Sequence, residues 1–264
     1  MPLDEAKISI MDIGILRGYS VYDGMAVING KVLRFSDHWQ RFTQGAGALN
    51  LNIPITEELL EKKIIEITEK SGLSTRANIR LILTGGQTLG GIDYDSEKPT
   101  FYAVVEKWES LPKEYYQIGA KLITREHMRE MPKFKTTNYI EAVKLQKKRK
   151  DTGAVEILYT LEGEVLECAT SNVFLVKDSV LITPATDILG GITRKIVLEL
   201  AEGNYKIEQR KVLEEELESA DEVFITSSFK DVVPIVKIDD FSISNGGVGP
   251  VTKDFMQRFA KYIA

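Results

Sequence analysis

The alternation of hydrophobic and polar residues predicts strands near the start of the chain. Residues 7–11 and 20–27 alternate as half-buried strands do. Asn29-Gly30 separates the second run from residues 31–34, and this dipeptide favours the positive φ angles of tight hairpin turns. We therefore expect a β-hairpin over residues 20–34.

Helical spacing follows the hairpin. Asp37 is expected to cap a helix, because an aspartate side chain accepts hydrogen bonds from the first backbone amides of a helix. A second helix is predicted over residues 56–71, where apolar residues recur at helical spacing. Strands at 78–84 and 99–106 complete a mixed sheet with two helices. The sequence thus predicts a small α+β domain over residues 1–110.

Residues 111–119 have no clear period and are interpreted as an interdomain linker, after which short strands alternate with helices. Helices are predicted over residues 138–150, 193–203, 213–219 and 249–264. Strands are predicted at 120–124, around Ile157, Val173 and Val180, and at 206–212 and 222–226. Residues 120–264 are therefore expected to form a larger domain of mixed α/β character.

Composition excludes several classes of partner. The 264 residues are 43% hydrophobic and 28% charged, as in ordinary globular proteins, and a formal net charge of −5 argues against nucleic acid or an anionic membrane. No apolar stretch reaches the length of a membrane span, and the Met1 end lacks the apolar core of a signal peptide. Cys168 is the only cysteine, so no intrachain disulfide can form. We expect a cytoplasmic protein.

Candidate chemistry concentrates between Lys135 and Asn172. Lys135 opens the polar tripeptide Lys135-Thr136-Thr137, just before a predicted helix. Glu167 ends the run Gly163–Glu167, which follows a turn, and the small polar residues Ala169–Asn172 lead into an apolar strand. A lysine, an acid and a cluster of small polar residues thus lie at the ends of regular elements, where a site built on strands keeps its functional groups.

Four motifs in this order resemble those of the class IV pyridoxal-phosphate aminotransferases. They are Lys-x-x-Asn at 135–138, Gly-x-Val-x-Glu-x-x-x-Ser-Asn-x-Phe at 163–174, Gly-Ile-Thr-Arg at 191–194 and Ala-Asp-Glu-Val-Phe at 220–224. The resemblance covers nearly the whole chain. It implies the two-domain fold type IV, with a small mixed-sheet domain and a larger β-barrel-like domain with helices. It also implies pyridoxal 5'-phosphate as cofactor, ping-pong transamination between an amino acid and a 2-keto acid, and a homodimer with shared active sites.

The resemblance assigns the two residues that act on the cofactor ring. Lys135 matches the lysine that forms the Schiff base and moves the proton. Lys133 is the nearest competitor, but only Lys135 is followed by Asn138 and Tyr139 at the family's spacing. Glu167 matches the acid at the pyridine nitrogen, where a carboxylate and a ring cation stabilise each other's charge. No metal ion is expected.

The phosphate group needs its own ligands. Ile192 and Thr193 stand at a predicted helix start, where backbone amides bind anions, and Ser227 and Ser228 match a second, hydroxyl-bearing phosphate loop. Arg41 matches an arginine that reaches the phosphate from the small domain. The other residues that the resemblance places around the cofactor are Tyr139, Ser171, Asn172 and Leu189.

Substrate recognition is where the sequence departs from the family. Gly18–Asp23 replaces the usual Gly-Asp-Gly-Val-Phe/Tyr-Glu, although Tyr22 keeps the aromatic position. Arg17 and Arg80 are predicted to hold the substrate carboxylate by charge-assisted hydrogen bonds, and the alternative for each is a surface ion pair. These arginines and the motif Lys-Thr-Thr-Asn favour a D-amino-acid aminotransferase. An L-branched-chain aminotransferase is the first alternative and aminodeoxychorismate lyase the second.

Two hypotheses from other classes of function are less favoured. The glycine-rich stretches 85–91 and 246–250 lack the Gly-Lys-Ser/Thr ending of a P-loop and a following dinucleotide-binding context, which favours simple turns, although the first stretch is compatible with an active-site loop. A non-enzymatic protein that binds pyridoxal phosphate is the other alternative. It is disfavoured because every position that would contact the cofactor is filled by a suitable residue.

Overall fold

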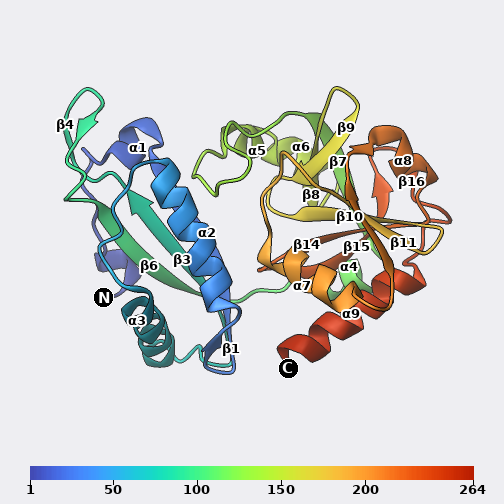
Figure 1. Cartoon of the computed structure of the whole chain (residues 1–264), viewed down its shortest axis with the longest axis horizontal. Helices are drawn as coiled ribbons and strands as arrows, with labels where there is room; N and C mark the ends of the chain where they lie inside the picture. The colour runs from blue at the N-terminus through green and yellow to red at the C-terminus, as the bar shows by residue number, and fades with distance from the viewer. The chain divides into compact units, whose positions relative to one another are not determined.

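The computed structural model describes all residues from 1 to 264 and divides into two compact units (Figure 1). The first unit consists of Met1–Trp108 together with Phe134–Asn138, and the second of Glu109–Lys133 together with Tyr139–Ala264. Residues 134–138 were expected in the larger domain, whereas backbone hydrogen bonds join them to the first unit. That the two units are independent domains stays a prediction.

The first unit is built on a four-stranded antiparallel sheet. Its strands, in spatial order, are β2 (Lys31–Val32), β1 (Ser20–Ile28), β3 (Arg76–Thr84) and β6 (Thr100–Lys107). Two amphipathic helices, α2 (Phe35–Ala48) and α3 (Glu57–Lys70), pack on this sheet (Figure 1). Their apolar faces bury a core that includes Met25, Phe42, Leu60, Ile64 and Leu81. Burial of such side chains typically contributes about 1.5–3 kcal/mol each. Because the buried residues of each helix recur at helical spacing, the sequence predicted both helices.

The hairpin turn is confirmed, and two expectations about the first unit are wrong. Asn29 and Gly30 have φ angles of 49° and 76°, as the Asn-Gly turn requires. Residues 7–11 form no strand, because no neighbouring strand pairs with them and all five are exposed. Asp37 does not cap α2. The helix begins at Phe35 with Arg34 as N-cap, so Asp37 lies in its first turn, 3.6 Å from the Arg34 guanidinium.

Short elements complete the first unit. They are the 3₁₀ helix η1 (Leu3–Glu5), α1 (Ile13–Arg17) and the small hairpin of β4 (Thr88–Gly90) and β5 (Asp93–Tyr94). Backbone hydrogen bonds from Ile13 N to Gly86 O and from Thr88 N to Met11 O hold the chain before α1 beside the β4–β5 hairpin. The glycine-rich stretch 85–91 therefore contributes to a paired turn.

The second unit is a curled ten-stranded sheet. Its strands are β7 (Ala120–Glu126), β8 (Glu156–Leu161), β9 (Glu164–Cys168), β10 (Asn172–Lys177), β11 (Val180–Pro184), β12 (Lys206–Arg210), β13 (Val212–Leu213), β14 (Glu222–Ser227), β15 (Asp231–Ile238) and β16 (Phe241–Ser242). The order is β12-β11-β10-β14-β15-β7-β8-β9-β13, with β16 beside β15. Because β9 also contacts β10 and β11, and β13 contacts β11, the sheet nearly closes into a barrel.

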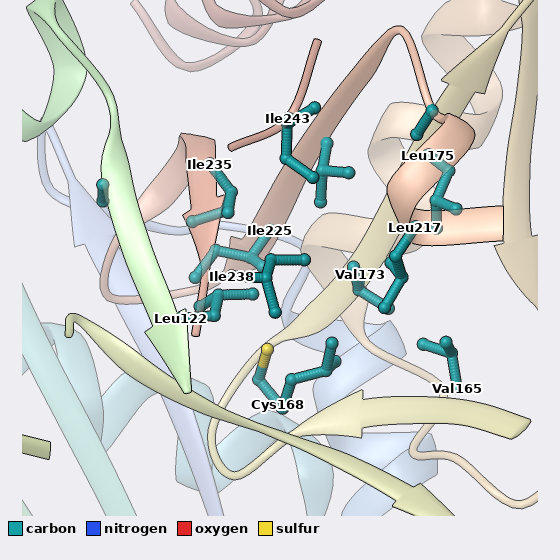
Figure 2. Packing of buried hydrophobic residues seen from close by; sticks show 14 of the residues in the cluster. Leu122, Val165, Cys168, Val173, Leu175, Leu217, Ile225, Ile235, Ile238 and Ile243 are labelled. Atoms are coloured by element: carbon teal, nitrogen blue, oxygen red, sulfur yellow. The ribbon is translucent and has the colours of Figure 1, made fainter. Parts of the chain in front are cut away.

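Strand alternation buries both faces of this sheet. Figure 2 shows Leu122, Cys168, Val173 and Ile225 among the side chains that fill its interior. On the outer face the rings of Phe174 and Phe224 stack with centroids 4.9 Å apart. The helix α9 (Pro250–Ile263) covers them, with the Phe255 ring 5.6 Å from that of Phe224. This packing explains the continuous apolar runs that the sequence shows here.

The remaining helices refine the predicted boundaries. α7 (Ile192–Ala201) and α8 (Glu214–Ser219) lie where the sequence placed them. The helix expected over residues 138–150 is two short helices, α5 (Ile140–Lys144) and α6 (Gln146–Asp151), and the expected linker contains α4 (Lys113–Gln117). None of the helices combines the length and the apolar character that crossing a membrane requires.

Candidate active site

Lys135 lies on a short segment that extends the sheet of the first unit. Tyr22 N donates to Lys135 O at 2.9 Å and Thr137 N to Ser20 O at 3.3 Å, so the segment runs antiparallel to the start of β1. The Lys135 Nζ lies 4.6 Å from the centroid of the Tyr22 ring, within the range of a cation–π contact. Lys135 is half-buried, whereas Lys133 is exposed. The structure thus gives the two competing lysines different surroundings.

Arg41 belongs to a buried charge network in the same unit. Its Nε and Nη2 donate to the two carboxylate oxygens of Asp23, each at 2.8 Å, and His38 Nδ1 donates to Asp23 at 2.7 Å. Burial alone would raise the pKa of Asp23, but Arg41 and His38 outweigh it and hold that pKa well below its usual range. Burial lowers the pKa of His38, against the opposing effect of Asp23. Asp23 therefore fixes the orientation of the Arg41 guanidinium.

Glu167 is a buried carboxylate with an arginine partner. Arg129 donates to its Oε1 from Nε at 2.8 Å and from Nη2 at 2.6 Å, while Oε2 accepts from Leu189 N at 3.0 Å. The side chains of Arg129 and Glu167 are only 11% and 6% exposed, so the arginine stabilises the ionised acid. Arg129 was not predicted from the sequence, because nothing in its local spacing separates it from the neighbouring basic residues.

The start of α7 is shaped to receive an anion. Gly191 is its N-cap, and no side chain caps the first amides of the helix, which include those of Ile192 and Thr193. Asn172 Nδ2 donates to Leu189 O at 2.8 Å, and its Oδ1 would lie 1.9 Å from a Cβ atom at Gly191. The turn before α7 therefore requires glycine at this position.

A second strand end stands beside Asn172. Thr226 is its direct partner in the pairing of β10 with β14, and the Thr226 hydroxyl is buried without a hydrogen-bond partner. The half-buried Ser227 and Ser228 follow, and Ser227 Oγ accepts from Lys230 N at 3.2 Å. An unpaired buried hydroxyl next to two serines is suited to a polar ligand. Thr226 was not predicted from the sequence, because nothing in its local pattern separates it from other threonines in strands.

Two further residues predicted at the cofactor lie in the second unit. Ser171 is buried, and its hydroxyl donates to Glu156 at 3.2 Å. Tyr139 is half-buried and stands at the N-cap of α5, where it packs against the buried cluster that contains Ile157 and Leu166.

The predicted substrate residues have separate surroundings in the first unit. Arg17 is exposed and donates from Nη1 to Leu16 O at 2.9 Å. Arg80 is 45% exposed and lies 2.9 Å from Glu106. The register of β1 and β3 puts Arg80 opposite Gly24, hence on the same sheet face as Tyr22, while Asp23 faces the other side. Tyr22 and Arg80 thus share a face, and Arg17 makes only a local contact.

Comparison with known proteins shows which family the chain belongs to. Residues 20–238 match the family model described as amino-transferase class IV. The chain belongs to the class IV aminotransferases. It is 33% identical to a Methanocaldococcus jannaschii protein named "Putative branched-chain-amino-acid aminotransferase", over 97% of this chain and 91% of that protein. It is 29% identical to the D-alanine aminotransferase of Listeria monocytogenes, over 98% and 92% of the two chains.

Solved structures agree with this assignment. A branched-chain amino acid aminotransferase from the organism abbreviated T.th., solved with pyridoxamine 5'-phosphate, superposes with a TM-score of 0.91 at 28% identity, covering 100% of this chain and 91% of that one. The predicted fold type IV is confirmed, and so are the family and the cofactor. The chain is a pyridoxal-phosphate-dependent aminotransferase, with amino acids and 2-keto acids as substrates.

The residues of this class IV aminotransferase suit the cofactor chemically. The uncapped start of α7 and the unpaired Thr226 hydroxyl offer donors for a phosphate group. The arginine-bound Glu167 offers a fixed negative charge for a protonated ring nitrogen. These features all belong to the second unit.

Proposed function

We propose that Lys135 is the lysine that binds pyridoxal phosphate and moves the proton during transamination. The observation that carries this proposal is the amine of the half-buried Lys135, 4.6 Å from the centroid of the Tyr22 ring, in a segment paired to β1. The exposed Lys133 has no such setting. An amine next to an aromatic face and partly shielded from water is suited to a covalent role.

We also propose how the cofactor is held. Glu167 faces the ring nitrogen, and the amides of Ile192 and Thr193 bind the phosphate together with the hydroxyls of Thr193, Ser227 and Ser228. Arg41 completes the phosphate site, and its guanidinium is held by Asp23. The remaining positions around the cofactor are assigned to Tyr139, Ser171, Asn172 and Leu189.

The mechanism follows from these roles. Bound pyridoxal phosphate supplies an aldehyde that condenses with amines and a ring that accepts electrons from the substrate α-carbon. Released from the cofactor by the substrate amine, Lys135 Nζ would remove the proton from the α-carbon of the amino donor as a general base and would deliver it as a general acid to the cofactor carbon that had held the lysine; in the second half-reaction both transfers run in reverse. Glu167 keeps its negative charge through the Arg129 and Leu189 hydrogen bonds, which favours the protonated ring nitrogen. The amino group thus moves to a 2-keto acid in two half-reactions.

For the amino donor we propose D-amino acids. Support comes from the Lys-Thr-Thr-Asn motif and from the similarity to a D-alanine aminotransferase over nearly the whole chain. Tyr22 and Arg80 share the sheet face next to Lys135, which suits an aromatic contact and a carboxylate ligand, and Arg17 is proposed as a second carboxylate ligand. An L-branched-chain donor is the second candidate, favoured by the Methanocaldococcus jannaschii relative and by the solved branched-chain enzyme.

Single-turnover spectra separate the two donors. The protein loaded with pyridoxal phosphate is mixed separately with D-alanine, D-glutamate, L-leucine and L-glutamate, without a keto acid. We expect conversion to the pyridoxamine form with the D-amino acids only, and a slower conversion in Arg80→Ala. Conversion by L-leucine alone would replace the D-specific proposal by the branched-chain one.

We propose a homodimer in the cytoplasm. The first unit exposes Ile10, Ile15, Leu89 and Ile92, each at least 61% exposed, around the hydrogen-bonded contact between the chain before α1 and the β4–β5 hairpin. Apolar side chains gathered in this way favour an interface between copies. Sedimentation of the wild type and of Ile15→Asp tests this. The wild type should sediment as a dimer, and the variant should remain monomeric up to a higher protein concentration than the wild type.

A further inference from the structure

Lys230 occupies an unusual position for a lysine. It follows Ser227 and Ser228 in the turn between β14 and β15, and its side chain is only 18% exposed. The Nζ forms an ion pair with the buried Glu156, donates to Thr170 Oγ1 at 2.5 Å and to Ser171 Oγ at 3.1 Å. Its three donors therefore have three acceptors, none of which lies on its own turn.

These contacts connect three segments that are distant in the sequence. Glu156 is the first residue of β8, and Thr170 and Ser171 lie in the loop between β9 and β10. The backbone of Lys230 is also fixed, since its N–H donates to Ser227 O and Oγ and its carbonyl accepts from the Tyr116 hydroxyl at 3.0 Å. The lysine thus ties the Ser227–Lys230 turn to the loop that leads into Asn172.

The charges of this cluster are balanced. Burial would raise the pKa of the Glu156 carboxyl, but Lys230 and the hydroxyl of Thr170 outweigh burial and lower that pKa. Glu156 is therefore ionised and accepts hydrogen bonds from Thr170 and Ser171 as well as from Lys230. Hydrogen bonds between charged groups are stronger than those between neutral groups. The ion pair of Lys230 and Glu156 therefore holds both loops in one arrangement.

We propose that Lys230 is a positioning residue for the phosphate of the cofactor, with Glu156 as its anchor. This inference rests on the proposed phosphate role of Ser227 and Ser228. Lys230 holds the turn that carries these serines at a fixed place relative to Ser171 and Asn172, so that their donors are arranged before the phosphate arrives. Preorganised donors bind more tightly because less ordering remains to be done on binding.

The test compares two ligands that differ only in the phosphate. Affinities of the full chain, stripped of cofactor, are measured for pyridoxal 5'-phosphate and for pyridoxal. The wild type should prefer the phosphorylated ligand strongly. Lys230→Met should lose about tenfold or more of that preference, as expected when a charge-assisted contact is removed, with little change for pyridoxal. The matched control is Lys206→Met, because the side chain of Lys206 is 70% exposed. This variant should keep the preference for pyridoxal 5'-phosphate over pyridoxal.

A double variant separates positioning from simple stability. Lys230→Met leaves Glu156 buried without its cation, which by itself destabilises the fold. In Lys230→Met/Glu156→Gln the melting temperature should recover towards that of the wild type, while the preference for the phosphorylated ligand stays reduced. Full recovery of that preference in the double variant overturns the proposal, and so does an unchanged preference in Lys230→Met. A wild type that binds both ligands equally would instead refute the phosphate role of Ser227 and Ser228.

Discussion

Replacing Asp23 by asparagine tests the buried charge network of the first unit. Asp23 is fully buried, and its partners Arg41 and His38 are 10% and 1% exposed. An amide keeps the shape of the side chain but removes the carboxylate charge that faces the Arg41 guanidinium. Breaking a buried pair in this way costs about 3–5 kcal/mol, and because Arg41 retains slight access to water we expect the lower end. For a chain of this size this corresponds to a fall of about 6–12 °C in melting temperature.

The pH dependence of this effect has a defined sign. The folded-state pKa of Asp23 lies below its ordinary value of about 3.9, because Arg41 and His38 favour the ionised form more than burial opposes it. The native state therefore binds fewer protons than the unfolded state at low pH. The stability that Asp23 contributes is fully present above the ordinary pKa and is lost as pH falls towards the folded-state pKa. The difference between wild type and variant should be present at pH 7 and should shrink when the solution is acidic enough to protonate Asp23.

The assay is urea unfolding of the wild type and Asp23→Asn, both without cofactor, at several pH values. Asp151→Asn is the matched control, because the side chains of its ion pair with Lys147 are 59% and 87% exposed and such exposed pairs contribute about 0–1 kcal/mol. Equal stability of wild type and Asp23→Asn at pH 7 would refute the reasoning. A gap that persists undiminished in strong acid would refute the assignment of the titrating group.

Three further predictions concern the second unit. Gly191→Ala should weaken binding of pyridoxal phosphate, measured by titration, because the new Cβ displaces Asn172, whereas Gly190→Ala has open space and should bind normally. Arg129→Met should lower the melting temperature by leaving the Glu167 carboxylate without its cation, at a cost of about 3 kcal/mol, and an unchanged melting temperature would contradict the buried pair. Cys168 is buried, which raises the pKa of its thiol, so the native protein should resist alkylation by iodoacetamide at pH 8 and react only after unfolding.

The sequence predicted those parts of the fold that local periodicity and turn chemistry control. The Asn29-Gly30 turn, α3 and α9 lie close to their expected bounds because each has a hydrophobic face or a dipeptide that few other structures satisfy. The failures arise where tertiary contacts decide. Residues 7–11 alternate like a strand but have no neighbouring strand to pair with. The Lys135 segment looked like part of the larger domain, yet it pairs with β1 of the first unit.

The candidate site shows the same division. Motifs that continue over several residues predicted Lys135 and Glu167, whose roles stay predictions. Arg129, Thr226 and Lys230 were not predicted, because their importance depends on the tertiary structure. The acid that pairs with Arg129 is 38 residues away in the sequence, and the acid that pairs with Lys230 is 74 residues away. A basic residue that neutralises a buried acid has no local signature, and only the fold brings the pair together.

The identity of the lysine that binds the cofactor is the central claim, and covalent trapping tests it most directly. The protein loaded with pyridoxal phosphate is reduced with borohydride, digested and analysed by mass spectrometry, with Lys135→Ala and Lys133→Ala as matched variants. We predict that the phosphopyridoxyl group is found on Lys135 in the wild type and in Lys133→Ala, and that Lys135→Ala carries none. Specific labelling of Lys133, or of any lysine in Lys135→Ala at the level of the wild type, would contradict the assignment.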